Sequence, residues 1–372
     1  MTGLYIHIPF CVKKCHYCNF VVTTAHTPQS RAAFLGALGK EMIHYKADFK
    51  NIDFETLYLG GGTPSVMSVE ETAALFDRVK GNFRFKKDAE VTCEINPGDL
   101  DRAKADNYRR MGVNRISLGA QSFQDATLKR LNRTHTAEDI SASFGLLRAA
   151  GFENIGLDLI LSLPQETLAD VKNSLDQLIG LGPEHVSLYE LTIEEKTVFG
   201  SLHKKGKLAL PDEDLQIQML STARATLKKA GFLHYELLNY AKPGFESRHN
   251  RIYWDNQEYL GLGPGAFSYI GGRRFMVAAH VAEYLEKAGK DDWTAFEEEQ
   301  LSVEKKEAES FLLALRLTEG AELRRFHSWA EKMKDPIGRL EEKELLSREN
   351  GRIRLTARGQ FFAETVFSEL TT

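Results

Sequence analysis

Three of the four cysteines in this chain of 372 residues lie in one short segment, at Cys11, Cys15 and Cys18. A disulfide would use two of them and leave one over. A structural zinc ion binds four protein ligands, and the nearby candidate His16 adjoins Cys15, where its geometry would be awkward. Three thiolates from one loop could instead hold an iron–sulfur cluster and leave one of its irons open. An open metal position is typical of a reactive site.

The composition argues against binding to polyanions and against a membrane anchor. The net charge is −4, so we expect no general nucleic-acid binding and no electrostatic attraction to membranes. The segment MTGLYIHIPF lacks the pattern of a signal peptide, and no apolar run approaches the roughly 18 residues of a membrane span. We therefore expect a cytoplasmic protein without an integral membrane segment. Its thiols would stay reduced and would serve a metal or catalysis rather than disulfides.

Short apolar runs alternate with helical patterns as far as Ala230. The expected strands, apolar on both faces as in a covered parallel sheet, are Leu4–Ile8, Thr56–Gly61, Glu90–Asn96, Arg115–Gln121, Asn154–Pro164 and His185–Ile193. The expected helices, several of which end at a glycine, are Arg31–Tyr45, Ser68–Val79, Leu100–Met111, Ala137–Ala150, Leu168–Leu181 and Glu213–Ala230. The rhythm predicts an α/β fold with a partial, TIM-like (β/α)6 barrel, because the candidate functional groups follow the strands, as they do at a barrel mouth.

The pattern changes after the last of these helices. His234–Ala241 predicts one further strand, at the end of a barrel domain of residues 1–240. Residues 241–300 predict a connecting region rich in glycine and aromatic residues. Residues 301–372 predict a smaller, mostly helical domain that resembles a winged helix. Such a domain can bind DNA or serve only for packing, and the mixed charge of this segment favours packing.

Polar residues follow the expected strands in chain order. The run GGGTP at Gly60–Pro64 lacks the Gly-Lys-Ser/Thr ending of a phosphate-binding loop, so alone it predicts only a turn. Glu94, Gln121 and Asp158 come next, and each alone is best explained as a capped strand end or a solvated charge. Cys93 lies inside an expected buried strand and is interpreted as a core residue. The glycine run, Glu94, Gln121 and Asp158 occur in order along successive expected strands, and this order favours a common site.

The spacing CxxxCxYC, followed by GGGTP, resembles the radical S-adenosylmethionine (SAM) superfamily. The resemblance implies a [4Fe–4S] cluster on Cys11, Cys15 and Cys18, whose open iron binds the amino and carboxylate groups of SAM and from which an electron can cleave SAM to a 5′-deoxyadenosyl radical. It also implies the SAM contacts, which are Tyr17 near the adenine, the backbone of Gly61, Gly62 and Thr63 near the methionine amino group, and Tyr5, Glu94, Gln121, Arg133, Asp158 and Thr192 around the rest. Glycine permits close backbone approach, and the arginine fork suits a carboxylate.

A narrower resemblance, to the family of oxygen-independent coproporphyrinogen III dehydrogenase and its relatives, covers roughly Leu4 to Leu262. It rests on the motifs IHIPFC, LYLGGGTPS, EINPGDL, GVNRISLGAQSF, LNRTH and LDLILSLPQET. The dehydrogenases carry a further cysteine where this chain has Phe20, and an extension before the first strand. The HemW-type heme chaperones of the same group carry HNxxYW, which is present here as His249–Trp254. This branch implies heme as a ligand, with His249 as its axial ligand, and a heme-acceptor protein, such as a respiratory-chain enzyme, as a partner.

Several interpretations stay open at this point. Taken alone, HNRIYW predicts a packed aromatic corner with a surface histidine more readily than a heme site. With the family resemblance, the expected function is a heme chaperone in which cluster and SAM serve assembly or control rather than turnover. The alternative is a coproporphyrinogen III dehydrogenase, which converts propionate side chains to vinyl groups by radical oxidative decarboxylation. A zinc-stabilised barrel without a redox role is a third hypothesis, and a homodimer is compatible with the sequence.

Overall fold

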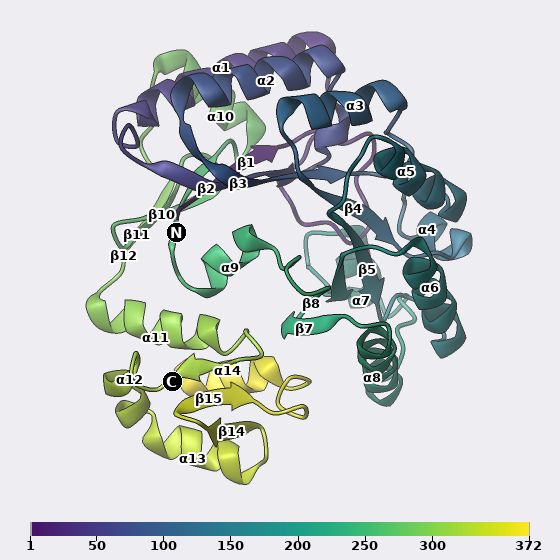
Figure 1. Cartoon of the computed structure of the whole chain (residues 1–372), viewed down its shortest axis with the longest axis vertical. Helices are drawn as coiled ribbons and strands as arrows, with labels where there is room; N and C mark the ends of the chain where they lie inside the picture. Colours follow the sequence, from purple (N-terminus) through teal and green to yellow (C-terminus); the bar gives the residue numbers. More distant parts are fainter. Residues whose placement is uncertain (1, 372) are drawn as a thin grey trace.

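One large sheet forms the barrel in the computed structural model, which describes residues 2–371 (Figure 1). Its central strands are parallel and lie side by side in chain order. They are β1 (Thr2–Ile8), β2 (Asp53–Gly61), β3 (Arg84–Ile95), β4 (Arg115–Gln121), β5 (Ile155–Leu161) and β6 (His185–Glu190). Most residues of β1 and β5 are buried, which agrees with the continuous apolar pattern of a covered parallel sheet.

Most of the helices that connect these strands cover the outer face of the sheet (Figure 1). The helices between β1 and β6 are α1 (Pro28–Lys46), α2 (Val69–Asn82), α3 (Arg102–Met111), α4 (Asp125–Arg130), α5 (Ala137–Ala149) and α6 (Leu168–Leu181), with a short 3-10 turn, η1, at Pro64–Val66. Two more helices follow β6, α7 (Val198–Lys204) and α8 (Glu213–Lys229). The predicted capping signals are confirmed. Ser68 and Glu71 form a capping box at the start of α2, and Gly112 ends α3 in the left-handed region at φ 96°.

The barrel is open between its first and last strands. β6 pairs with β8 (Asn239–Ala241), which forms a hairpin with β7 (Leu233–Glu236). On the other side, β1 pairs in parallel with β9 (Glu258–Leu262). β1 and β6 therefore each have another neighbour, and the predicted partial barrel is confirmed.

The hairpin β7–β8 corrects one expectation, because a single strand over His234–Ala241 is wrong. The chain turns immediately after Glu236. The carboxylate of Glu236 accepts hydrogen bonds from the N–H of Leu238 (3.0 Å) and from the side-chain amide of Asn239. Local bonds from a side chain to the following residues stabilise a turn against a continuous strand.

The segment after the hairpin extends the same sheet and also adds a helix to its inner side. It contains α9 (Arg248–Trp254), β9, β10 (Phe267–Ile270), β11 (Arg273–Met276), α10 (Val281–Lys290) and β12 (Glu297–Gln300). α10 packs beside α1, where the Lys40 ammonium donates to the carbonyl of Ala288 (2.9 Å). α9 lies on the inner side of the sheet, between the barrel strands and the C-terminal elements (Figure 1).

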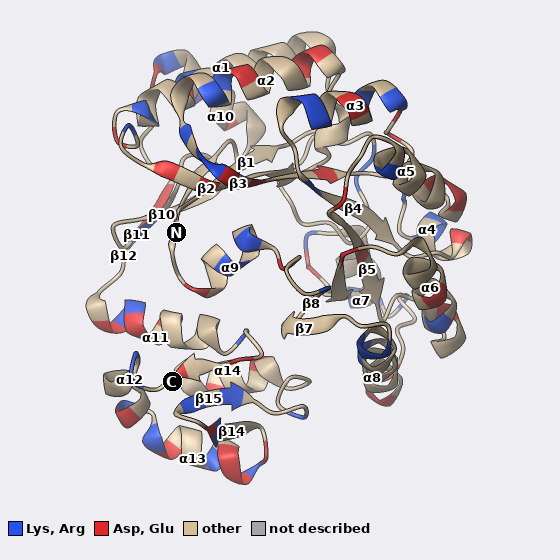
Figure 2. Cartoon of the chain, viewed as in Figure 1, with Lys and Arg blue, Asp and Glu red and all other residues tan. Residues whose placement is uncertain are grey.

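The C-terminal elements have a small sheet and a hydrophobic core of their own. They are α11 (Val303–Ala314), β13 (Ala321–Glu322), α12 (His327–Lys332), α13 (Lys334–Glu342), β14 (Leu346–Glu349), β15 (Arg352–Leu355) and α14 (Ala363–Thr371). The β14–β15 hairpin next to helices is the winged-helix-like arrangement that the sequence predicts. Acidic and basic residues alternate over this unit (Figure 2), as in the ion pair between Arg339 and Glu369 at 3.1 Å. Within residues 2–371, no helix is long and apolar enough to cross a membrane.

Candidate functional site

A cavity of about 420 Å³ lies at the carboxyl ends of the barrel strands. Loops after parallel strands converge at this end, which is why functional side chains gather there. The predicted site residues that line the cavity are Cys11, Cys15, Tyr17, Cys18, Gly61, Gly62, Thr63, Glu94, Gln121, Arg133, Asp158 and Thr192. Tyr5 and His249, which were also predicted as site residues, lie elsewhere in the barrel.

The cysteine loop follows β1 and is fixed by backbone bonds. The N–H of Cys11 donates to the carbonyl of Thr23 (3.1 Å), and the N–H of Cys18 donates to the carbonyl of Cys15 (3.2 Å). All four cysteines of the chain are free thiols. Burial raises the pKa of Cys11 to about 11 and also raises the pKa of Cys18. These thiols therefore need a cationic partner in order to ionise, and a bound iron cluster supplies one.

The arrangement of these thiols does not resemble a site for one metal ion. Within residues 2–371, no three Cys, His, Asp or Glu side chains converge on a point that one ion could occupy. His16, considered above as a fourth zinc ligand, uses its Nδ1 atom in a bond with the carbonyl of Arg130 (2.8 Å). The thiolates of a [4Fe–4S] cluster would bind different irons, so such a cluster does not require its three cysteines to converge on one point. The zinc hypothesis gains no support from this geometry.

The glycine loop after β2 is bonded directly to the cysteine loop. The N–H of Gly62 donates to the carbonyl of Ile8 (2.9 Å), and that of Thr63 donates to the carbonyl of Phe10 (2.8 Å). The hydroxyl oxygen of Thr63 lies 3.4 Å from the sulfur of Cys11. A Cβ atom on Gly62 would lie 2.7 Å from the oxygen of Ile8 and 2.8 Å from that of Phe10. Only glycine therefore fits at this position without moving the backbone.

We predict that Gly62→Ala destabilises the protein, because a methyl group would press on two carbonyl oxygens. The expected loss is about 1–3 kcal/mol in the free energy of unfolding, as for other overpacked sites. Gly36→Ala is the matched control, since Gly36 lies in α1 with open space at its Cβ position, and alanine should stabilise that helix by roughly 0.5–1 kcal/mol. Urea unfolding of both variants measures the effects. If Gly62→Ala were as stable as wild type, the close approach at Gly62 would be contradicted.

Two half-buried carboxylates face the cavity, one from β3 and one from β5. Glu94 accepts hydrogen bonds from the hydroxyl of Tyr58 (2.7 Å) and from the N–H of Gly61 (3.1 Å). Burial raises the pKa of Glu94 to about 7. Asp158 accepts from the hydroxyl of Ser117 (3.1 Å), and burial also raises its pKa. A cationic ligand in the cavity would favour ionisation of both groups, and SAM carries a sulfonium and an ammonium group.

Arg133 and Gln121 complete the polar lining. The Arg133 side chain is half-buried, and its guanidinium donates to the carbonyl of Gly119 (2.8 Å), to the side chain of Asn96 and, at 3.5 Å, to the sulfur of Cys15. Gln121 has a left-handed backbone with φ 66°, which is strained for a residue other than glycine. Its side-chain oxygen is buried and has no hydrogen-bond partner among the described residues. A ligand with hydrogen-bond donors would satisfy this oxygen, so the residues present fit SAM.

Two residues that support this site are not indicated by the motifs. Tyr58 holds Glu94 from outside the cavity, and Asn96, which lines the cavity, accepts a bond from Arg133. The alternation of β2 gives the signal for Tyr58, because it places a polar aromatic residue inside a barrel. For Asn96, the only signal is its place immediately after β3.

Tyr5 lies behind the cavity in the barrel interior. Its hydroxyl is 3.1 Å from the Nδ1 atom of His7. Its ring centroid lies 6.1 Å from that of Tyr58 and 6.4 Å from that of His249. Tyr5 is therefore a neighbour of residues that shape the cavity and does not line it.

His249 is buried at the inner side of the sheet, with 1% of its surface exposed. Its Nδ1 atom bonds with the hydroxyl of Thr56 (2.7 Å), and its Nε2 atom bonds with the hydroxyl of Tyr253 (2.9 Å). Burial lowers the pKa of His249 to about 3, so the imidazole is neutral. The aromatic packing around the motif is present, but the histidine is not a surface residue. In this conformation both ring nitrogens are used within the chain.

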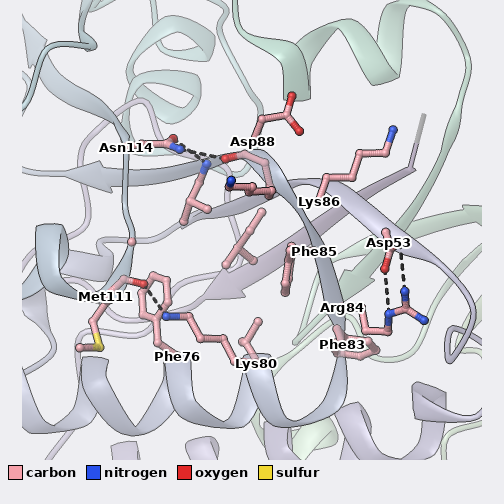
Figure 3. A pocket seen from close by; sticks show the side chains of 16 residues that line it. Asp53, Phe76, Lys80, Phe83, Arg84, Phe85, Lys86, Asp88, Met111 and Asn114 are labelled. Carbon is pink, nitrogen blue, oxygen red and sulfur yellow. Dashed lines mark hydrogen bonds and ion pairs between the residues drawn. The ribbon is translucent and has the colours of Figure 1, made fainter.

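A second and larger cavity, of about 870 Å³, lies at the amino ends of β2 and β3 (Figure 3). Phe83 and Phe85 contribute to its apolar lining. Its rim carries Arg84, which is paired with Asp53 at 2.8 Å. Most of the predicted cofactor residues line the other cavity, at the barrel mouth, and none of them lines this one.

Comparisons with known proteins agree with this fold. Residues 5–178 match the family model of the Radical SAM superfamily, and residues 301–362 match that of the HemN C-terminal domain. The solved structure of coproporphyrinogen III oxidase (HemN) from Escherichia coli has a TM-score of 0.88 with this chain, at 23% sequence identity, over 100% of this chain and 90% of that one. At that identity, the likeness shows the fold alone.

Curated relatives are similar over nearly the whole chain. The heme chaperone HemW of Bacillus subtilis (strain 168) is 36% identical over 99% of this chain and 98% of its own length. The protein of the same name from Lactococcus lactis subsp. lactis (strain IL1403) is 36% identical, over 99% of this chain and 97% of its own. The one from Escherichia coli (strain K12) is 37% identical over 72% of this chain. The chain therefore belongs to the HemW family, and the family predicted from the motifs is confirmed.

Proposed function

We propose that this protein is a heme chaperone, which binds heme and transfers it to an acceptor protein. The observation that carries the proposal is the similarity to proteins named heme chaperone HemW along 99% of the chain. The intact HNRIYW motif at His249–Trp254 agrees with it. We also propose a cytoplasmic location, a heme-dependent respiratory enzyme as the acceptor, a homodimer as the assembled form, and no role in nucleic-acid binding. Gel filtration of the protein with and without heme tests the dimer.

The barrel-mouth cavity is proposed to hold a [4Fe–4S] cluster on Cys11, Cys15 and Cys18, with SAM beside it. When bound, the cluster supplies a reducible iron centre with an open position for SAM. The residues of the chain hold and orient these groups. Glycine backbone at Gly61 and Gly62 permits close approach, and the unpartnered oxygen of Gln121 is an acceptor for SAM. Tyr17, Thr63, Glu94, Arg133, Asp158 and Thr192 complete this proposed set, with Tyr5 behind it.

Heme is the cargo of this proposal, and His249 is its proposed axial ligand. A neutral imidazole is a common ligand of heme iron, and the pKa of about 3 keeps His249 neutral. Its Nε2 atom must leave Tyr253 before it can bind iron, and the ring must become exposed. Heme ligation by His249 therefore requires α9 to move away from the inner side of the sheet.

We expect His249→Ala to weaken heme binding by on the order of tenfold or more. Loss of the iron–nitrogen bond should cost more binding free energy than the roughly 1.4 kcal/mol that corresponds to a factor of ten in Kd. Titration of the anaerobically reconstituted protein with heme, followed by absorbance, measures the affinity and the ligation state. His203→Ala is the control, since His203 is exposed on α7 and outside the motif. An unchanged heme spectrum and affinity in His249→Ala would disprove the axial ligand.

The dehydrogenase alternative is not favoured. The structural likeness to HemN is the observation that would support it, but at 23% identity this likeness shows only a shared fold. Phe20, at the position of the further cysteine in that enzyme, is 64% exposed at the rim of the cavity. Anaerobic incubation with reductant, SAM and coproporphyrinogen III tests both candidates. The chaperone proposal expects no protoporphyrinogen, and its formation would favour the dehydrogenase.

A further inference from the structure

A path of direct contacts joins His249 to the barrel-mouth cavity. The His249 ring stacks on Tyr58, with centroids 5.0 Å apart and an interplanar angle of 29°. The Tyr58 hydroxyl donates to Glu94 (2.7 Å), and Glu94 lines the cavity and also accepts from the N–H of Gly61 (3.1 Å). His249 is buried, and Tyr58 and Glu94 are half-buried, so the path runs through the barrel interior to the cavity. The position of His249 therefore sets the position of a carboxylate in the cavity.

α9 is held in place from the barrel side. The carboxylate of Glu90, on β3, accepts from the N–H of Arg248 and from that of His249, both at 3.0 Å. A carboxylate at the start of a helix satisfies N–H groups that have no partner within the helix. The Thr56 hydroxyl binds the His249 ring from β2. These contacts define a closed state in which His249 supports Tyr58.

α9 is also held from the C-terminal side. The amide of Asn256, just after α9, donates to the hydroxyl of Ser310 on α11 (2.8 Å). Arg251 on α9 forms an ion pair with Glu319 (2.8 Å). Movement of α9 therefore breaks contacts on both sides at once, which favours two discrete positions over a continuous drift.

We infer that His249 is a positioning residue for the SAM cavity, and that heme and SAM bind with opposing effects. This inference rests on the proposed function. When the imidazole leaves Tyr58 for a heme iron, Tyr58 loses the ring against which it packs and Glu94 loses its fixed donor. SAM binds better to the closed state, whereas heme ligation requires the open one. Linkage then makes each ligand lower the affinity of the other by the same factor.

The positioning role is tested without heme, by SAM affinity after cluster reconstitution. His249→Phe keeps a ring on Tyr58 but has no ligand nitrogen, whereas His249→Ala has neither. We expect His249→Ala to weaken SAM binding by about tenfold, within the usual range of coupling, and His249→Phe to bind SAM close to wild type. Tyr58→Phe removes only the bond to Glu94 and should weaken SAM binding similarly. The control is Tyr269→Phe, which should leave SAM affinity unchanged. The Tyr269 hydroxyl is buried and has no hydrogen-bond partner in the described part of the chain.

Iron content of each variant verifies that fold and cluster are retained, so that a change in SAM affinity reports on the cavity. Equal SAM affinity in His249→Ala, Tyr58→Phe and wild type would overturn the positioning role. So would a loss in His249→Phe as large as in His249→Ala, because the ring alone would then not suffice.

The opposing effects are tested by measuring SAM affinity with and without heme. We expect heme to weaken SAM binding by about tenfold in wild type and to have no effect in His249→Phe, which cannot ligate iron. If wild type binds heme through His249 while its SAM affinity stays constant, the coupling is overturned and the proposed function stands. If wild type binds no heme, the proposed function fails and the coupling fails with it, whereas the heme-free variants still decide the positioning role.

Discussion

Iron incorporation should fall to background in Cys15→Ser. Cys15 lies in the cavity beside the Arg133 guanidinium, whose N–H contacts its sulfur at 3.5 Å. A serine hydroxyl is a poor ligand for cluster iron, which binds soft thiolates. The remaining two thiols of the loop would leave the cluster with too few ligands. Anaerobic reconstitution, followed by iron and sulfide analysis and electron paramagnetic resonance of the reduced protein, measures the effect.

Cys93→Ala is the matched control for this experiment. Cys93 is a buried core residue of β3 and does not line the cavity, so its loss should lower stability slightly and leave the iron content unchanged. Circular dichroism should be the same for Cys15→Ser and wild type, because the apolar core is untouched. A wild-type iron content in Cys15→Ser would remove the cluster from this loop, and with it the proposal for the cavity.

Glu41→Gln should stabilise the protein relative to wild type as the pH rises from 5 to 8. Glu41 is buried on α1, and one of its oxygens accepts from the Tyr284 hydroxyl (2.6 Å) and from the N–H of Gly263 (2.9 Å). The other oxygen has no partner among residues 2–371. Burial raises the pKa of Glu41 to about 7, and the groups that face it include the phenol of Tyr45. The charged form is therefore disfavoured in the folded state.

The sign of this effect follows from proton binding. Because the unfolded carboxyl has a pKa of about 4.3, the folded state binds more protons between that value and 7. Wild-type stability therefore decreases as the pH rises through this window, by at most about 4 kcal/mol from this group. Glutamine does not titrate, so the difference in unfolding free energy between Glu41→Gln and wild type should grow with pH. Urea unfolding of the apoprotein measures it, and Glu153→Gln at an exposed loop position controls for the chemical change. A difference that stays constant with pH would contradict the prediction.

The barrel and its mouth could be predicted from sequence because each signal is local. Glu94, Gln121 and Asp158 lie on three successive strands, β3, β4 and β5, and parallel strands bring their carboxyl ends together whatever the detailed packing is. Glu94 and Asp158 therefore reach one cavity, although they are far apart in the chain. The cysteine spacing is equally local, since one loop carries all three thiols.

The environment of His249 could not be predicted in this way. HNRIYW is a mixed polar and aromatic hexapeptide, which is compatible with a surface helix. Its burial comes from β1, β2 and α11, and partners such as Thr56 and Glu319 are distant in sequence. The hairpin after Glu236 was missed for a related reason, because apolar residues continue through its turn and mask it.

The position of α9 between the barrel strands and the C-terminal elements has a consequence for how such a protein would bind and release heme. An imidazole that is concealed most of the time has an apparent affinity reduced by the fraction of molecules in which it is uncovered. If heme binds as proposed above, loading is governed by how often α9 leaves the barrel, and not by the intrinsic strength of the iron–nitrogen bond alone.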